Sequence, residues 1–197
     1  MKLTFLLLWL SVPVVWAAWH YGPGQEAIKR DRADKALALA KTDAVTEDFD
    51  AAIAGYDAAL AALPKDEIAQ SRRIRLARAR AMVDGHRLPD GHRELEGLYE
   101  ELTTDPQVEP GVVNGTREAL ANAKYYRTWL MRLEGQAREV WEPEIESARQ
   151  HFRHLAEQDS PVLTSTDRKR SQENLESAIK LARMDLAELQ GLPLPSQ

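Results

Sequence analysis

The chain has 197 residues, a formal net charge of −5 and no cysteine. The lack of cysteine excludes a disulfide scaffold, a cysteine nucleophile, a thiolate metal site and a lipoprotein anchor. The acidic balance disfavours broad binding to nucleic-acid phosphates, so we expect no nucleic-acid partner. There are 28 alanines and only three phenylalanines, a composition that favours closely packed helices over sheets.

The first 18 residues read as a targeting or anchoring segment. Lys2 precedes an apolar run over residues 3–10, and small residues around Ala17 suit signal-peptide cleavage. Residues 3–19 would also serve as a short uncleaved membrane anchor, with Trp16, Trp19 and Tyr21 at its far interface. Both alternatives place the body of the protein outside the cytoplasm, in the periplasm or cell envelope.

A linker over residues 19–24 contains the breaker cluster Gly22-Pro23-Gly24 and separates this segment from the body. The first three predicted helices cover residues 25–43, 49–63 and 66–83. Residues Thr46–Asp48 cap the second helix, and Gly85 suits the position that follows the third.

Four more helices are predicted over residues 89–102, 116–133, 143–157 and 167–189. Thr116 is the expected N-cap of the fifth, and Pro143 fits the first turn of the sixth. No stretch alternates with the period of a strand. A helical domain over residues 25–190 and a tail over residues 191–197 follow from this pattern.

The fifth predicted helix carries two apolar stripes. One contains Ala119, Ala123 and Tyr126, and the other contains Tyr125 and Trp129, roughly 100° around the helix axis. A helix with two apolar faces needs neighbours on two sides, as in a stack of helices. The fold class we expect is therefore all-α, with antiparallel helical hairpins stacked as a short solenoid.

The segment from Ala52 to Pro64 resembles the second helix of a tetratricopeptide repeat. Ala52, Tyr56, Ala59 and Pro64 stand at the spacings typical of that family, and Tyr99 and Phe152 take the place of Tyr56 in two degenerate copies. The spacing between copies, 43 and 53 residues, exceeds the family period of about 34 residues. The resemblance implies packing roles for these six residues and a concave surface formed by the first helix of each pair.

Basic and aromatic side chains gather on the third and fifth predicted helices, which this resemblance places on the concave surface. Arginine forks suit carboxylates, and aromatic rings offer rigid contact area. We therefore expect a partially cationic groove for a protein or peptide, with acidic groups or a free C-terminus as suitable features of the partner. Its candidate residues are Arg72, Arg75, Arg78, Lys124, Tyr125, Arg127, Trp129 and Arg132. Solvated or ion-paired arginines, and a core position for Tyr125 and Trp129, are the competing interpretation.

The leading functional prediction is a non-enzymatic interaction or scaffold protein of the cell envelope, without metal or cofactor. One alternative is a small metal-binding protein or enzyme that uses His151, His154 and Glu157, which are spaced three residues apart on one helix. Another is the subunit of a structural homo-oligomer.

Overall fold

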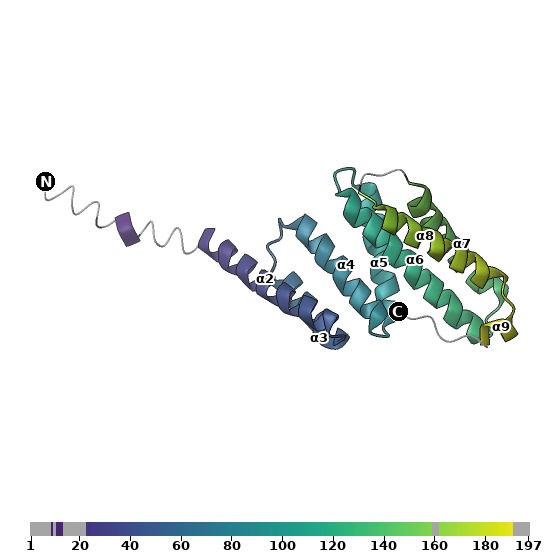
Figure 1. Ribbon diagram of the computed structural model, residues 1–197. Helices are drawn as coiled ribbons and strands as arrows, with labels where there is room; N and C mark the ends of the chain where they lie inside the picture. Colours follow the sequence, from purple (N-terminus) through teal and green to yellow (C-terminus); the bar gives the residue numbers. More distant parts are fainter. Residues whose placement is uncertain (1–8, 10, 14–22, 159–161, 191–197) are drawn as a thin grey trace.

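The computed structural model describes residue 9 and residues 11–13, 23–158 and 162–190 (Figure 1). Between Pro23 and Gln190 these residues form eight helices and no strand. The helices are α2 (Pro23–Val45), α3 (Phe49–Ala62), α4 (Ile68–Asp84), α5 (Leu88–Thr104), α6 (Pro110–Leu133), α7 (Arg138–Glu157), α8 (Ser165–Arg183) and α9 (Leu186–Gln190). The predicted all-α class is confirmed.

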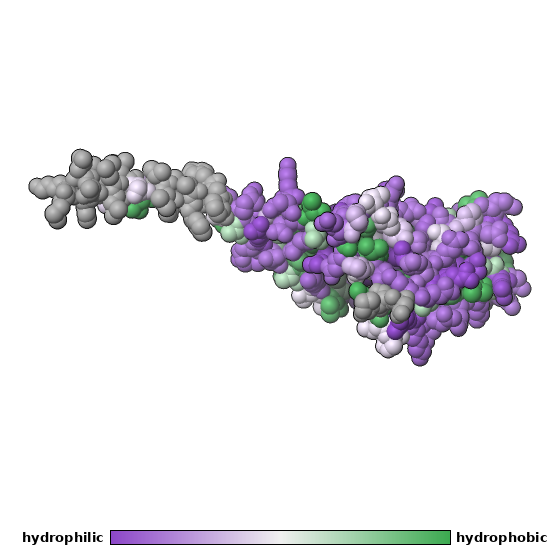
Figure 2. Space-filling model, turned by 90° about the horizontal axis from the view of Figure 1, so that it is seen from above, coloured by the Kyte–Doolittle hydropathy of each residue, from purple (hydrophilic) through white to green (hydrophobic). Residues whose placement is uncertain are grey.

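Each helix from α2 to α8 packs on its neighbour in the sequence, and Figure 1 shows the α2–α3 hairpin at one end of the body and α6, α7 and α8 grouped at the other. Two contacts skip a helix: α4 also touches α6, and α6 also touches α8. Figure 2 shows hydrophilic residues over most of one face of this body, with hydrophobic residues in separate patches. The apolar stripes of the helices are thus largely covered by neighbouring helices.

Three clusters of buried residues follow one another along the chain. The first joins α2, α3 and α4, the second joins α4, α5 and α6, and the third joins α6 to α9. Helices α4 and α6 each contribute to two clusters. This explains why α6 carries the two apolar stripes that were noted in the sequence.

The predicted repeat-packing residues lie in or beside these clusters. Ala52 and Ala59 are fully buried, Tyr56 and Phe152 are nearly so, and Pro64 is buried at the end of α3. Tyr99 is half-buried, and its hydroxyl accepts hydrogen bonds from Arg117 Nε and Nη2 at 3.1 and 2.9 Å.

The largest error in the predicted boundaries concerns α6, which begins at Pro110 rather than after Thr116. Thr116 is not an N-cap: it lies inside the helix, and its Oγ1 donates to the carbonyl of Val112 at 2.8 Å. Pro110 instead supplies the start, because a proline in the first turn sacrifices no helical hydrogen bond. Gly111 and Gly115 lie within the helix.

Other helix ends also differ from the prediction. Helix α2 begins at Pro23, inside the predicted linker, and α7 begins at Arg138, so that Pro143 lies inside the helix. After α4, the residue with positive φ is His86 (φ 62°), whereas Gly85 has φ −84°. The predicted seventh helix is divided into α8 and α9, because Met184 is extended and Asp185 Oδ1 accepts from the amide of Glu188 at 2.7 Å.

The predicted leader (1–18), linker (19–24) and tail (191–197) lie almost wholly outside the described residues. Among the residues that are described, no helix combines the length and the apolar character needed to cross a membrane.

Candidate functional site: a groove between α4, α6 and α8

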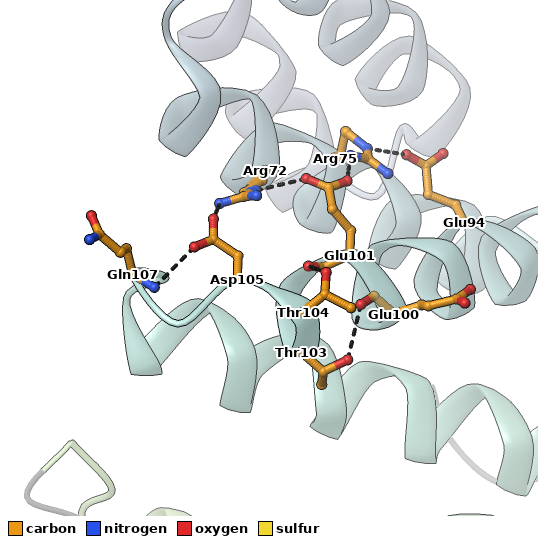
Figure 3. Close-up of polar contacts among 9 residues, drawn as sticks. All are labelled: Arg72, Arg75, Glu94, Glu100, Glu101, Thr103, Thr104, Asp105 and Gln107. Carbon is orange, nitrogen blue, oxygen red and sulfur yellow. Dashed lines mark hydrogen bonds and ion pairs between the residues drawn. The ribbon is translucent and has the colours of Figure 1, made fainter.

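The arginines predicted to line a cationic groove on α4 are paired with the acidic residues of α5. Arg72 contacts Glu101 and Asp105, both at 2.8 Å, and Arg75 contacts Glu101 at 2.6 Å (Figure 3). Hydrogen bonds from Arg72 and then Arg75 lower the pKa of Glu101. The backbone amide of Gln107, followed by Arg72, lowers the pKa of Asp105.

Arg78 completes this network by bridging Asp57 of α3 and Glu94 of α5. The Arg75, Arg78 and Glu94 side chains are less than one-third exposed, so the network is shielded in part from solvent. Because these ion pairs join α3, α4 and α5, they help to fix the positions of the three helices relative to one another. Because these guanidinium groups already have carboxylate partners, this face of α4 is not a free cationic surface.

The predicted basic residues of α6 are likewise engaged. Lys124, which is 7% exposed, contacts Glu96 at 2.9 Å and Glu144 at 3.2 Å, and Arg127 contacts the other oxygen of Glu144 at 3.2 Å. The pKa of Glu144 falls to about 2, chiefly through the buried imidazole of His92, whose Nε2 lies 3.7 Å from Oε2, and also through Lys124 and Arg127. These ion pairs link α5, α6 and α7 where the three helices pack together.

The three remaining predicted binding residues belong to the C-terminal core. Trp129 is buried, and the half-buried Tyr125 ring packs against it with 6.2 Å between centroids. Arg132 donates to the carbonyls of Leu181 and Met184 at the end of α8, and its guanidinium lies 4.7 Å from the centroid of the Trp141 ring. The structure therefore places the eight predicted residues in ion pairs or in the core and does not gather them on one open surface.

The alternative metal ligands do not converge either. His151 packs edge-on against Tyr99 with 5.1 Å between centroids, whereas His154 is exposed and Glu157 pairs with Arg153 at 3.3 Å. Burial, followed by the nearby charges of Arg117 and Lys124, lowers the pKa of His151 to about 4. In the described part of the chain, no three His, Asp or Glu residues are arranged to hold a metal ion.

An open groove does occur on α4 and α6, on a different face from the one predicted. Two adjoining hollows of about 360 and 350 Å³ lie between α4, α6 and the start of α8, and they share Arg80 and Glu118. Leu76, Val112 and Ala119 contribute apolar surface to this groove. At Gly115 helix α6 comes close to the side chains of α4, since an added Cβ would lie 3.4 Å from Leu76 Cδ2 and from Arg80 Nη2.

The charged walls of this groove neutralise one another. Arg73 pairs with Glu109, and Glu118 lies 3.7 Å from both Arg80 and Arg170. Burial raises the pKa of Asp84, which lines the second hollow. With paired charges at its edges and apolar residues between them, the groove suits an uncharged polar ligand better than a strongly acidic one.

Asn114 gives the groove an unused hydrogen-bonding group. The residue is 6% exposed and lines the first hollow, yet its Nδ2 has no hydrogen-bond acceptor in the described structure. A buried amide donor without an acceptor costs about 1–3 kcal/mol. An acceptor from outside the chain, either an ordered water or a ligand carbonyl, would satisfy this donor.

The groove and the predicted binding residues lie on different faces of α4. Arg73, Leu76 and Arg80, which line the groove, recur at spacings of three and four, and Arg72, Arg75 and Arg78 recur at a spacing of three. Each set forms a stripe along one side of α4, and the aliphatic stems of the arginines add apolar surface to both stripes. Only the position of α5 distinguishes them, because it covers one stripe with carboxylates.

Comparison with known proteins yields no relative. No protein-family model, no curated protein and no solved structure matches this chain.

Proposed function

We propose that this protein is a non-enzymatic interaction module that binds an extended peptide segment of a partner protein in the groove between α4, α6 and α8. The observation that carries the proposal is the buried Asn114, which lines the first hollow and whose side-chain Nδ2 lacks an acceptor. An amide donor of this kind matches a peptide carbonyl, and the neutralised walls match a peptide without a large net charge.

The arrangement of the helices supports a short solenoid with tetratricopeptide-like hairpins. In this interpretation α2, α4, α6 and α8 are the first helices of successive pairs. The contacts of α4 with α6 and of α6 with α8 agree with such stacking, as do three core clusters that share helices. The resemblance of residues 52–64 to that family is a fold-level analogy and supplies no partner.

A selection from a phage-displayed library of random 12-residue peptides against the purified full chain tests the binding proposal. We expect enriched peptides whose affinity falls at least tenfold with Asn114→Leu and with Asn122→Ala, which changes the second hollow. Asn174→Ala on α8, outside both hollows, is the matched control and should leave binding unchanged.

Asn114→Leu also separates a binding role from a structural one. The substitution removes an unpaired buried donor, so the free energy of unfolding should stay unchanged or rise while peptide affinity falls. No enrichment over an unrelated folded protein, or selected peptides that bind both asparagine variants normally, would rule the groove out.

We further propose that the body of the protein is exported to the cell envelope, cleaved from or tethered by residues 1–18. The support is the apolar, small-residue pattern of this segment. Alkaline phosphatase, which needs an oxidising compartment to fold, is a suitable reporter. Fused after Gln197 in a bacterial host, it should be active with the full chain and inactive when residues 2–18 are deleted. Equal activity of the two fusions would contradict export.

A further inference from the structure

The outer face of α8 lacks the second helix that covers the first helix in each preceding pair. Helix α3 packs along α2, α5 along α4 and α7 along α6, whereas α9 has only five residues and packs mainly on α6. A hollow of about 710 Å³ remains beside α8 and α9. It is lined by Glu176, Ile179, Lys180, Arg183, Met184 and Ala187, together with Glu188.

The charges on this face are arranged for pairing with a copy of itself. Glu176 and Arg183 lie on opposite sides of the midpoint between Ile179 and Lys180 and at equal distance from it, about 5 Å along the axis. Seven residues are almost two helical turns, so both side chains project from the same face. In an antiparallel pair of α8 helices, Glu176 of each copy would face Arg183 of the other.

The basic members of this face are available for such contacts. Within the described residues, neither Lys180 nor Arg183 makes an ion pair, and both are exposed. Ile179 is half-buried at the centre of the face, where the aliphatic stem of Lys180 from a second copy would cover it.

We propose that two copies of this chain associate through an antiparallel, two-fold contact between their α8 helices, with Glu176 of each paired to Arg183 of the other. Each α8 then serves as the missing covering helix of its partner. The contact involves a single helix per copy, so the interface is small and the association is expected to be weak. This surface is separate from the groove between α4, α6 and α8.

Crosslinking of single-cysteine variants tests the geometry, since the full chain has no native cysteine. Lys180→Cys lies next to the two-fold axis, and a short bismaleimide should link two copies into a species of twice the mass. Lys169→Cys is an equally exposed control on the same helix, but its two copies would be roughly 30 Å apart. Equal crosslinking of the two variants, or none of Lys180→Cys, would overturn the proposal.

Charge exchange then identifies the pairing. In the Lys180→Cys background, Glu176→Arg alone and Arg183→Glu alone should each reduce crosslinking at least fivefold, because each creates two like-charge contacts. The double exchange E176R/R183E should restore crosslinking. Circular dichroism of each variant confirms that the helices are intact.

A head-to-tail arrangement predicts a different result. There, α8 of one copy would contact α2 of the next, and a mixture of Lys180→Cys and Leu39→Cys chains would give the heterologous product without the Lys180 homodimer. That result, or failure of the double exchange to restore crosslinking in a folded variant, would overturn the two-fold contact.

Discussion

The two ends of the helical body are stabilised by different kinds of side-chain packing. In the α2–α3 hairpin, small residues allow close helix approach: a Cβ added at Gly55 would lie 2.8 Å from the Cβ of Ala40. Around α6, α7 and α8, large side chains fill the core, among them Trp129, Trp141 and Phe152. Helical pairing thus does not depend on one kind of packing. A close alanine interface should be sensitive to added volume, and an aromatic core to lost volume.

The largest effect should come from loss of volume in the C-terminal core. Phe152 is 1% exposed, and Phe152→Ala should lower the free energy of unfolding by about 3–5 kcal/mol through lost burial and the resulting cavity. Phe49→Ala, at a half-buried ring in the α2–α3–α4 cluster, is the matched control and should cost less than half as much. Urea unfolding measures both, and a larger cost at Phe49 would reverse the comparison.

Arg132 should provide the next largest contribution. Its guanidinium satisfies two carbonyls at the end of α8 and stacks on Trp141, so Arg132→Met should cost about 2 kcal/mol. Arg138 also lies over the Trp141 ring, at 6.0 Å, but its side chain is 67% exposed. Arg138→Met should therefore change the free energy of unfolding by less than about 0.5 kcal/mol. If both variants lose the same free energy of unfolding in urea, stacking on Trp141 accounts for the effect, and the hydrogen bonds to the α8 carbonyls do not.

At the N-terminal end, a single added methyl group should be harmful. Gly55→Ala should cost about 1–3 kcal/mol despite the better helix propensity of alanine, because backbone and Cβ atoms of Ala40 block the new group. Gly97 on α5 has nothing within 4 Å of the added Cβ, and Gly97→Ala should raise stability by about 1 kcal/mol. A thermal unfolding midpoint that rises in both variants would show that the α2–α3 contact is looser than described.

The smallest effect concerns pH. His151 has a folded-state pKa of about 4, below its ordinary value of 6.5, so the unfolded chain binds the extra proton between these values. Its contribution to stability is fully present above pH 6.5 and is lost as the pH falls through 4. Between pH 7 and pH 5 we expect a loss of about 1 kcal/mol, allowing for the partial exposure of the ring.

His151→Gln should remove this part of the pH dependence. His154→Gln, at an exposed position on the same helix, should leave it unchanged. Urea unfolding at several pH values makes the comparison. An unaltered slope in His151→Gln would assign the effect to other titrating groups.

The sequence by itself determined the helical class, most helix positions and the buried residues of the repeat-like segments. These features are local: apolar residues at spacings of three and four, a cap such as Asp48, whose Oδ1 accepts from the amide of Ala51, and breakers between helices. The predicted boundaries of α6 and α7 were wrong because Gly or Pro lies within each helix. Tertiary packing compensates there for the low helix propensity of these residues.

Only the tertiary structure decided which face of each helix is open. Arg72 and Arg73 are adjacent in sequence, yet one is bound by Glu101 and Asp105 of α5, whereas the other lines the groove with α6. Consecutive residues on a helix point about 100° apart. A basic stripe therefore becomes a binding surface or an internal ion-pair layer according to the helix placed against it, and that placement depends on contacts between residues distant in the sequence.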